Sequence, residues 1–444
     1  MNIKLLISSI LLSVCPVAIS AQILDIDGEE STSVGIYIKD ISTGEVLMDY
    51  NSGLALTPAS VTKVITTATA LSIKGANGHF TTNVVLRGEK AATGVWNGDI
   101  VVQAVADPTI ESAYFKSKLG FCDSIVAALK RNKITKINGT IVVENSLKDE
   151  GPILQWELED IAWPYGAGLF GFNYRDNSAT VYPNRNETKP IVPDMEICVK
   201  KADRNDVVRG IYSNKLVVFT RDTNDKKWGL SISVPDPAAV FRQELISKLN
   251  AAGISIDKKQ RTKTGSETVI YSHSSPSYSD IMRSLMVRSD NMFAEGMLRS
   301  IMPKESRRDV IKREKELWSE CGIDASNTII NDGSGLTRAN RLSARFIGDV
   351  LEYMANSQYA MTYASFFPRV GIEGTVKSFL QKTALAGTIA LKTGSVSSVQ
   401  SYAGYKLDSE GIPTHVIVIL VNGFFCQRKY VREAAENLLL DFFN

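Results

Sequence analysis

The character of the sequence changes twice along the chain, and these changes restrict its fold more than any other feature. From about residue 80 to about residue 270 the chain is a series of short apolar runs separated by Gly, Asn, Pro and charged residues, as at 98–105, 136–145 and 215–221. This pattern is typical of short β-strands. Two helices interrupt it, and we expect them at 111–132 and 237–253. The middle of the chain is therefore predicted to be mostly β.

The two flanks combine strands with amphipathic helices. Before the β-rich region we expect a hairpin over 34–50 and a helix over 56–75, in which Pro58 and Ser60 suit the start and Gly75 the end. After that region we expect helices over 279–302 and 308–322, strands at 387–393, 400–406 and 414–422, and a last helix over 432–443.

Neither flank alone supplies a complete layered domain. We therefore expect an α+β fold in which 22–82 and 273–444 form one domain, an antiparallel sheet flanked by helices. Residues 83–272 would be a large, mostly-β insertion into it.

The N-terminus reads as a secretory signal peptide, residues 1–21, because a positively charged start precedes a short apolar run and the small Ala21. The alternative is a buried N-terminal strand or helix. A lipid anchor would use Cys15, but Val14 and Pro16 beside it fit poorly with a lipoprotein signal. No later window is long and apolar enough to span a membrane. We expect a secreted protein of the periplasm or cell envelope, with no integral membrane span after signal cleavage.

Composition excludes several classes of function. The formal net charge of the 444-residue chain is +2, which gives no reason to expect a nucleic-acid partner. Cys122, Cys198, Cys321 and Cys426 are widely spaced, and the three histidines form no metal-ligand pattern with one another. We expect no metal and no organic cofactor. Whether the cysteines are free thiols or form a disulfide stays open.

Ser60 and Lys63 form an S-x-x-K motif at the start of the expected helix. Residues three apart on a helix share a face, and the free N–H groups of a first turn favour developing negative charge. A lysine whose pKa is lowered by burial or by a nearby cation can take the proton of a serine. The pair can therefore act as nucleophile and base without a histidine. An isolated S-x-x-K is more often a surface coincidence.

Ser289, Asp290 and Asn291 form an S-D-N motif within the helical region after the insertion. A bland interpretation is a helix cap, which needs only one of the three residues. In the functional interpretation Ser289 relays a proton to a leaving group, and Asn291 holds the substrate amide and the lysine.

Lys392, Thr393, Gly394 and Ser395 lie on an expected strand near the C-terminus. Lys392 and Thr393 can bind a carboxylate. Gly394 has no side chain, so that a substrate backbone can approach closely. The backbone N–H groups of Ser395 and Ser60 can form an oxyanion hole.

S-x-x-K, S-D-N and K-T-G are together the motif set of class A β-lactamases and penicillin-binding proteins, and their order discriminates between duplicate copies. A second S-x-x-K lies at 255–258 and a second K-T-G-S at 263–266. The second K-T-G-S precedes S-D-N. The second S-x-x-K follows a helix end, leaves little chain before S-D-N, and is expected in a solvated loop. Only Ser60, Ser289 and Lys392 follow the order with fitting spacing.

The sequence resembles the D-alanyl-D-alanine carboxypeptidase/endopeptidase family, the class C low-molecular-mass penicillin-binding proteins of serine peptidase family S13. Three more stretches carry the resemblance over nearly the whole mature chain: 106–110, 332–340 and 367–380. That family carries large inserted domains between its S-x-x-K and S-D-N motifs. The usual glycines before the D-P-T of 106–110 are absent. The E-x-x-L-N element of class A β-lactamases is not found, which argues against fast deacylation.

The resemblance implies a further residue, Asp160. The W-x-x-x-D stretch from Trp156 to Asp160 matches one whose aspartate, in that family, helps recognise the amine of the peptidoglycan stem peptide. The alternative is an acidic surface loop, because Glu157 and Glu159 stand beside it.

The resemblance therefore implies a serine D-Ala-D-Ala carboxypeptidase/endopeptidase of the penicillin-binding-protein fold. Its partners would be peptidoglycan peptides, with β-lactam antibiotics as covalent inhibitors of Ser60. Two alternatives remain: a β-lactamase or esterase on the same scaffold, and a non-catalytic wall-binding protein. The balance between carboxypeptidase and endopeptidase action is left open, as are the third residue of the stem peptide and the oligomeric state.

Overall fold

A computed structural model describes residues 23–26, 29–115, 120–221, 224–257 and 265–443. The expected signal peptide and Cys15 lie outside the described residues. Among the helices of the described chain, none is both long and apolar enough to cross a membrane. In the structure the four cysteines named above are free thiols.

The helices and strands of the described chain alternate in blocks, as the sequence predicts. The helices are α1 (Thr62–Lys74), α2 (Phe121–Arg131), α3 (Pro237–Ala251), α4 (Tyr278–Arg288), α5 (Asn291–Ser300), α6 (Arg307–Glu320), α7 (Ala344–Ala355), α8 (Ala360–Ala364) and α9 (Arg428–Phe443). The strands are β1 (Ser33–Asp40), β2 (Val46–Tyr50), β3 (Thr81–Ala92), β4 (Val95–Gln103), β5 (Lys136–Asn138), β6 (Ile141–Glu144), β7 (Ser178–Tyr182), β8 (Glu187–Lys189), β9 (Glu196–Lys201), β10 (Asp206–Arg209), β11 (Lys215–Thr220), β12 (Leu230–Ser233), β13 (Ser255–Asp257), β14 (Ser266–Ser274), β15 (Ile389–Val396), β16 (Val399–Leu407) and β17 (Pro413–Asn422).

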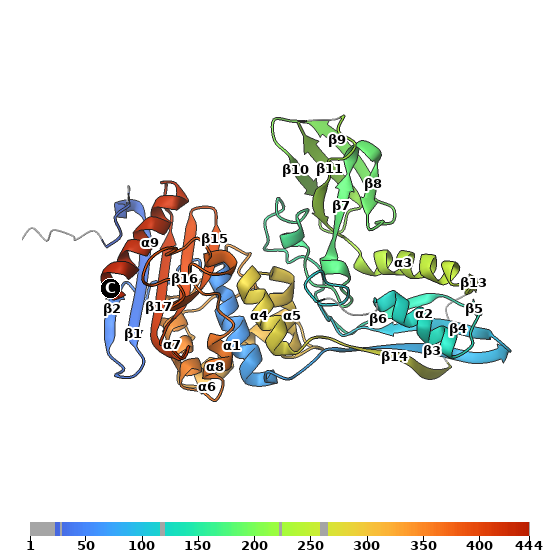
Figure 1. Ribbon diagram of the computed structural model, residues 1–444, viewed down its shortest axis with the longest axis horizontal. Helices are drawn as coiled ribbons and strands as arrows, with labels where there is room; N and C mark the ends of the chain where they lie inside the picture. The colour runs from blue at the N-terminus through green and yellow to red at the C-terminus, as the bar shows by residue number, and fades with distance from the viewer. Residues whose placement is uncertain (1–22, 27–28, 116–119, 222–223, 258–264, 444) are drawn as a thin grey trace, which may run out of the picture.

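One five-stranded sheet joins the two ends of the chain. Its order is β15-β16-β17-β1-β2, and every neighbouring pair is antiparallel. The closure between the two flanks is the β1–β17 pair, in which Ser33 lies opposite Asn422 and Asp40 opposite His415. Figure 1 shows this sheet with α9 on one side and α7 and α1 on the other. The predicted antiparallel sheet flanked by helices is present.

Both faces of the central strands of this sheet are buried, which explains their continuous apolar runs, whereas the edge strand β2 is largely exposed. In β17, Val416, Val418 and Leu420 pack into the core that contains α1 and α7. Their neighbours in sequence, such as Ile417 and Ile419, pack against α9. Successive side chains of a strand point to opposite faces, so a strand covered on both sides needs apolar residues at every position.

Helix α1 lies inside the larger core and is buried on all sides. Every residue from Thr62 to Leu71 is buried, so the apolar stripe seen in the sequence understates its burial. Its threonine hydroxyls are satisfied locally or by a neighbouring loop: Thr67 Oγ1 donates to the Lys63 carbonyl at 2.7 Å, and Thr66 Oγ1 to the Gly333 carbonyl at 2.7 Å. The helix ends where Gly75 takes a φ of 72°.

The β-rich middle of the chain forms three further sheets. The largest has the order β13-β5-β4-β3-β14 with β6 on β4, and α2 and α3 pack on it; the two smaller sheets are β10-β11-β9 and β12-β7-β8. The chain leaves the helical region through β3 and returns through β14, and these strands pair side by side, with Thr81 opposite Ser274. Figure 1 shows them extending away from α4 and α5. The domain limits at 82/83 and 272/273 stay a prediction.

Several sequence-based expectations need correction. The helix expected over 111–132 begins only at Phe121, because Gly120 directly before it is extended, with a φ of −62° and a ψ of 157°. Glu111, the first expected residue, takes a positive φ of 55° that a helix does not tolerate. Ser255 does not lie in a loop but in β13, where it pairs with Lys136. Helix α9 begins one turn before the expected residue 432, at Arg428. Helices α7 and α8 had no counterpart among the expected elements.

Candidate active site

Ser60 lies in a tight turn that leads into α1. The turn is the 3₁₀ helix η2 (Ala59–Val61), and Ala59 within it has a φ of 48°, a left-handed conformation that is unfavourable for alanine. The surrounding backbone holds the turn: a side chain at Gly335 would stand only 1.8 Å from the Ala59 carbonyl oxygen. Ser60 is therefore presented at the start of the buried helix by a closely packed, strained backbone.

Lys63 is fully buried beneath Ser60, one turn along. Its ammonium donates three hydrogen bonds: to Ser60 Oγ at 2.9 Å, to Asn291 Oδ1 at 2.7 Å and to the Ser334 carbonyl at 2.5 Å. Burial lowers the pKa of Lys63 to about 8, although Asp332, Asp290 and Glu295 oppose the shift. The structure thus places the lysine in contact with the serine, as the S-x-x-K spacing predicts.

The S-D-N motif occupies the break between α4 and α5. Ser289 ends α4 with a φ of 62°, and the Asp290 carboxylate caps α5 by accepting from Phe293 N at 3.0 Å. The capping interpretation therefore holds for Asp290. Two hydrogen bonds fix the orientation of the Asn291 side chain. Its Nδ2 donates to the Tyr165 carbonyl at 2.8 Å, and its Oδ1 accepts from Lys63.

Lys392 points from β15 toward the S-D-N break. Its Nζ donates to Ser289 Oγ at 2.8 Å and to the Thr393 carbonyl at 2.5 Å. The pKa of Lys392 lies well below its usual value, first because the side chain is completely buried and then because Lys63 is a nearby like charge. Two buried lysines therefore flank the two serines, and the charge of Lys63 disfavours the protonated form of Lys392.

Strand β15 is an edge strand of the five-stranded sheet. A neighbouring segment forms hydrogen bonds with the outer edge of its first half. Leu391 N donates to the Pro368 carbonyl, and Val370 N donates to the Ile389 carbonyl, so the first half is covered by the neighbouring segment. Since backbone groups of alternate residues point to the same edge, the N–H of Ser395 points outward like that of Leu391. Thr393 and Ser395 line the clefts described below.

Gly394 lets β15 lie directly against the serine turn. A Cβ at this position would stand 2.4 Å from the Pro58 carbonyl oxygen and 3.1 Å from the Ser60 nitrogen. A glycine is therefore required at this position because the backbones of β15 and of the serine turn lie too close for a Cβ between them. Its role in substrate binding stays a prediction.

The loop 332–340 is a part of the site to which the sequence assigned no chemical role. Its organiser is the buried Asp332, whose carboxylate accepts hydrogen bonds from Trp156 Nε1 at 2.8 Å, Gly335 N at 2.8 Å, Thr337 N at 2.9 Å and Asn340 Nδ2 at 2.8 Å. The buried Glu295 accepts from Gly333 N and Ser334 N, both at 2.9 Å. These bonds fix the Ser334 carbonyl that receives Lys63. Because every residue type has a backbone carbonyl, no sequence signal identified the Ser334 carbonyl as an acceptor.

Asp160 reaches the site from the inserted region. It accepts a hydrogen bond from Tyr165 Oη at 2.9 Å, and partial burial raises its pKa. Its acidic neighbours are paired with a cation instead: Glu157 and Glu159 lie 3.4 Å and 3.8 Å from the guanidinium of Arg338. Asp160 therefore differs from the surrounding run of carboxylates.

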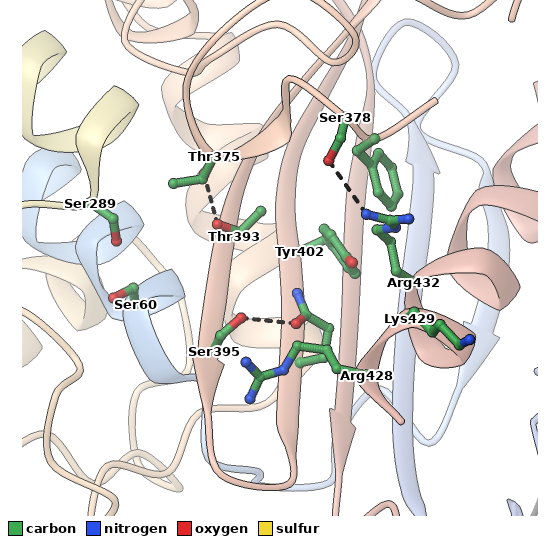
Figure 2. Close-up of a pocket in the computed structure, with 12 residues that line it drawn as sticks. Ser60, Ser289, Thr375, Ser378, Thr393, Ser395, Tyr402, Arg428, Lys429 and Arg432 are labelled. Carbon is green, nitrogen blue, oxygen red and sulfur yellow. Dashed lines mark hydrogen bonds between the residues drawn. The ribbon is translucent and has the colours of Figure 1, made fainter. Parts of the chain in front are cut away.

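Two clefts meet at Ser60, Ser289 and Ser395. The first encloses about 340 Å³ and is bounded by Asp160, Tyr165, Asn291, Gly335, Leu336, Arg338, Val396 and Ser397. The second, drawn in Figure 2, encloses about 460 Å³ and crosses β15 and β16 to reach α9. It is also bounded by Thr375, Ser378, Phe379, Thr393, Gln400, Tyr402, Arg428, Lys429 and Arg432. The sequence singled out none of the basic residues of the second cleft.

The described serines of the duplicate motifs, Ser255 in β13 and Ser266 in β14, lie apart from this site. Ser255 lines neither cleft, and Lys258, Lys263 and Thr264 fall outside the described residues. In the described part of the chain, no group of three or more His, Cys, Asp or Glu side chains is arranged to hold a metal ion.

Comparison with known proteins connects this geometry to a family. A family model described as "D-Ala-D-Ala carboxypeptidase 3 (S13) family" matches residues 17–439. A D-alanyl-D-alanine carboxypeptidase DacB of Haemophilus influenzae is 26% identical over 430 residues, which cover 89% of this chain and 86% of the relative. A D-alanyl-D-alanine carboxypeptidase of an Actinomadura species is 24% identical over 429 residues, 88% of this chain and 78% of the relative.

Solved structures show the same fold. Penicillin binding protein 4 (dacB) of Haemophilus influenzae superposes with a TM-score of 0.78 at 24% identity, covering 95% of this chain and 98% of that one. A predatory peptidoglycan endopeptidase of Bdellovibrio bacteriovorus superposes with a TM-score of 0.51 at 17% identity, covering 92% of each chain. The predicted fold class, a penicillin-binding-protein fold with a large insertion, is thereby confirmed.

Proposed function

The chain belongs to the D-Ala-D-Ala carboxypeptidase 3 (S13) family, and from this premise we propose that Ser60 is its nucleophile and Lys63 the base. The protein is a serine-type D-Ala-D-Ala carboxypeptidase that acts on peptidoglycan peptides. The observation that carries the assignment of roles is the contact of 2.9 Å between Lys63 Nζ and Ser60 Oγ, made by a fully buried lysine.

The partners of Lys63 direct its lone pair to the serine. Asn291 Oδ1 and the Ser334 carbonyl can only accept hydrogen bonds, so they retain two N–H groups when the ammonium loses a proton. The lone pair then faces Ser60, whose hydroxyl donates to it. With a pKa of about 8, about a tenth of the lysine is neutral at pH 7. This fraction supports general-base catalysis.

In the acylation step, Ser60 Oγ forms a bond to the carbonyl carbon of the penultimate D-Ala while its proton passes to Lys63. The outward N–H of Ser395 and the N–H of Ser60 are the proposed donors to the oxyanion. Gly394 supports this arrangement, because it holds β15 against the serine turn without a side chain between them.

Collapse of the tetrahedral intermediate breaks the C–N bond, and the leaving amine needs a proton. We assign its delivery to Ser289, whose Oγ accepts from Lys392 Nζ at 2.8 Å. The terminal carboxylate of the substrate is bound by Thr393 with Lys392. Asn291 binds the substrate amide, and Asp160 the amine of the stem peptide. The proton that Lys63 took from Ser60 replaces the one that Ser289 gave to the amine, so Lys63 is neutral again. Water then attacks the acyl carbon and gives a proton to Lys63, the bond to Ser60 Oγ breaks, and Lys63 returns the proton to Ser60 Oγ.

The same nucleophile is proposed to open β-lactams. A solved structure of the Haemophilus influenzae penicillin binding protein 4 is described as complexed with a β-lactam. We propose that β-lactams acylate Ser60 of this chain, that cross-linked peptides are also cleaved, and that the protein acts in the periplasm or cell envelope.

The assignment is tested with a synthetic stem pentapeptide ending in D-Ala-D-Ala. The wild type is expected to release D-Ala, and Ser60→Ala to lower kcat/KM by at least about a thousandfold, as for other serine nucleophiles. A labelled penicillin should stay bound to the wild type and fail to label Ser60→Ala. Many turnovers of the penicillin would instead indicate a β-lactamase.

The duplicate motif provides a matched control. Ser255→Ala removes the serine of the other S-x-x-K, which lies in β13 of the inserted region. Its activity and labelling should equal those of the wild type. D-Ala release that persists undiminished in Ser60→Ala would refute the assignment of the nucleophile.

A further inference from the structure

The two clefts that meet at Ser60 differ in charge. The one beside the inserted region contains Asp160 and Arg338. The one that reaches α9 contains Arg428, Lys429 and Arg432, and no Asp or Glu is among the residues that bound it. Figure 2 shows the basic side chains across β15 and β16 from Ser60. A molecule that extends from Ser60 toward α9 therefore meets a concentration of positive charge.

These basic residues occupy an unfavourable place in their helix. Arg428, Lys429 and Arg432 lie in the first five residues of α9, where the helix dipole is itself positive, and the first turn contains no acidic residue. Basic side chains stabilise a helix at its other end. The helix dipole therefore does not explain the position of these residues, and for Arg428 and Lys429 the position favours an anionic ligand.

Contacts within the protein neutralise this charge only in part. The Arg428 guanidinium donates to the Val396 carbonyl at 2.7 Å, at the end of β15, and within the described chain no carboxylate forms a salt bridge with it. Arg432 Nη1 donates to Ser378 Oγ at 3.4 Å, and its Nε lies 3.6 Å from Glu436. These contacts orient the two arginines along the cleft; Arg432 is paired with Glu436, whereas Arg428 contacts only a carbonyl oxygen.

The cleft has an apolar floor between Ser60 and the basic residues. The rings of Phe379 and Tyr402 are stacked at an angle, with their centroids 4.6 Å apart. Neighbouring strands lie about 4.8 Å apart, so crossing β15 and β16 to α9 takes roughly 10 Å. A leaving D-Ala is too short to reach α9, because one residue spans at most about 3.6 Å. A longer leaving group can cross the floor and reach the cations.

We infer that this cleft is a subsite for extended, acidic leaving groups, in which Arg428, Lys429 and Arg432 bind carboxylates beyond the one next to the scissile bond. The chemistry fits the second stem peptide of a cross-link, which leaves as an amine and carries further carboxylates. The inference rests on the proposed function, and it assigns the specificity for cross-links to the start of α9.

A matched pair of substrates isolates the charge of the leaving group. Both end in D-Ala followed by a long D-amino acid: D-2-aminopimelic acid in one, and its side-chain amide in the other. We expect the wild type to cleave the acid with a kcat/KM about threefold or more above that of the amide, as for an ion pair in partial contact with water. High ionic strength should reduce this ratio, because salt screens exposed charges.

The variant removes the three charges by Arg428→Gln, Lys429→Gln and Arg432→Gln, and the ratio should fall to about one. The control, Lys304→Gln with Arg308→Gln and Lys312→Gln, removes the same charge at and before α6, from residues that bound neither of the two clefts. It should keep the wild-type ratio, which shows that net charge is not responsible.

Three results overturn the inference: equal rates for acid and amide in the wild type, a ratio that survives in the triple variant, or an equal loss of the ratio in the control. If the wild type still releases D-Ala from the pentapeptide, only the subsite is refuted. If it cleaves none of these peptides, the proposed function fails, and the inference fails with it.

Discussion

Lys63 is the residue at which the pH dependence of the reaction is decided. Its pKa is lowered to about 8 by burial, and only its neutral form can take the proton of Ser60. The neutral fraction falls as pH falls, so kcat/KM for peptide acylation should rise through neutral pH and level off above about pH 8. A rate profile that is flat from pH 6 to about pH 9 would contradict this role.

The substitution Asn291→Asp tests the role of Lys63 through its hydrogen-bond partner, because it replaces an amide by a carboxylate of nearly the same shape. A carboxylate in place of the amide, 2.7 Å from Nζ, favours the ammonium and raises the pKa of Lys63. The rising limb of the profile should therefore move to higher pH by about one unit or more. The control is Asn214→Asp, an exposed position in the inserted region. If the rising part of the pH profile does not move in Asn291→Asp, a group other than Lys63 determines its position.

At the scale of residues, the sequence identified the side chains that meet in the site, but it did not identify the backbone carbonyls that accept hydrogen bonds from them. The structure brings Ser60 into contact with Lys63 and Ser289 into contact with Lys392, as the motif order predicts. The carbonyls of Ser334 and Tyr165 were missed, because any residue type has a carbonyl. Arg428 was missed because α9 starts one turn before the sequence indicated.

At the scale of single elements, the junction between η2 and β15 determines how precisely the site is built. Gly394→Ala would place a Cβ 2.4 Å from the Pro58 carbonyl oxygen, a backbone atom that cannot turn aside. We expect a loss of stability of about 1–3 kcal/mol. Displacement of β15 should also lower kcat/KM by up to about a hundredfold.

Urea denaturation and D-Ala release measure the two effects of Gly394→Ala. Gly53→Ala is the matched control, since a Cβ there meets no atom within 4 Å. Wild-type activity in Gly394→Ala would show that the close packing of β15 on the serine turn is not needed.

The loop 332–340 is an element held by one carboxylate. Asp332→Asn replaces an acceptor of several hydrogen bonds by a side chain that also donates, which leaves buried N–H groups without partners. The cost should be about 2 kcal/mol or more in the free energy of unfolding. Because the loop supplies the Ser334 carbonyl, the activity should fall as well.

Asp324→Asn serves as the control for this loop, because Asp324 is exposed and accepts from Ser326 N in a surface turn. Its stability should change by less than about 0.5 kcal/mol. Equal stabilities of Asp332→Asn and the wild type would remove the organising role of Asp332.

Element types were predicted more reliably than their ends. The strands of the five-stranded sheet show as apolar runs, whereas α7 was missed, although Ser343 caps it by accepting from Phe346 N. A cap is informative only when the apolar periodicity after it is recognised. The helix expected over 111–132 was extended too far, because residue type alone does not reveal the extended backbone of Gly120 or the positive φ of Glu111.

At the scale of the whole molecule, the site is assembled from both parts of the chain. The inserted region supplies the Tyr165 carbonyl to Asn291, the Trp156 indole to Asp332, and Asp160 to the first cleft. The insertion is therefore a wall of the site. A sequence pattern can locate such an insertion, but it cannot show which of its loops folds back.

The substitution Asp160→Asn tests whether this residue of the inserted region recognises the amine of the stem peptide. For stem peptides with a free amine on the third residue, kcat/KM should fall about tenfold, because the charged amine then faces a neutral amide and the charge-assisted hydrogen bond is weakened. For the same peptides with the amine acetylated, the change should be small. Glu159→Gln is the control, since its side chain is largely exposed and faces Arg338. Equal losses on both kinds of peptide would exclude amine recognition by Asp160.

The β1–β17 pair has a consequence for the order of events during biosynthesis. Strand β17 lies between β16 and β1, so within the sheet β15 and β16 are joined to the N-terminal strands only by a strand that ends at Asn422. A growing polypeptide that already contains Ser60 and Lys392 still lacks this strand, and contacts this distant in sequence form late. We therefore expect the nucleophile and the K-T-G lysine to come together only after β17 has entered the sheet.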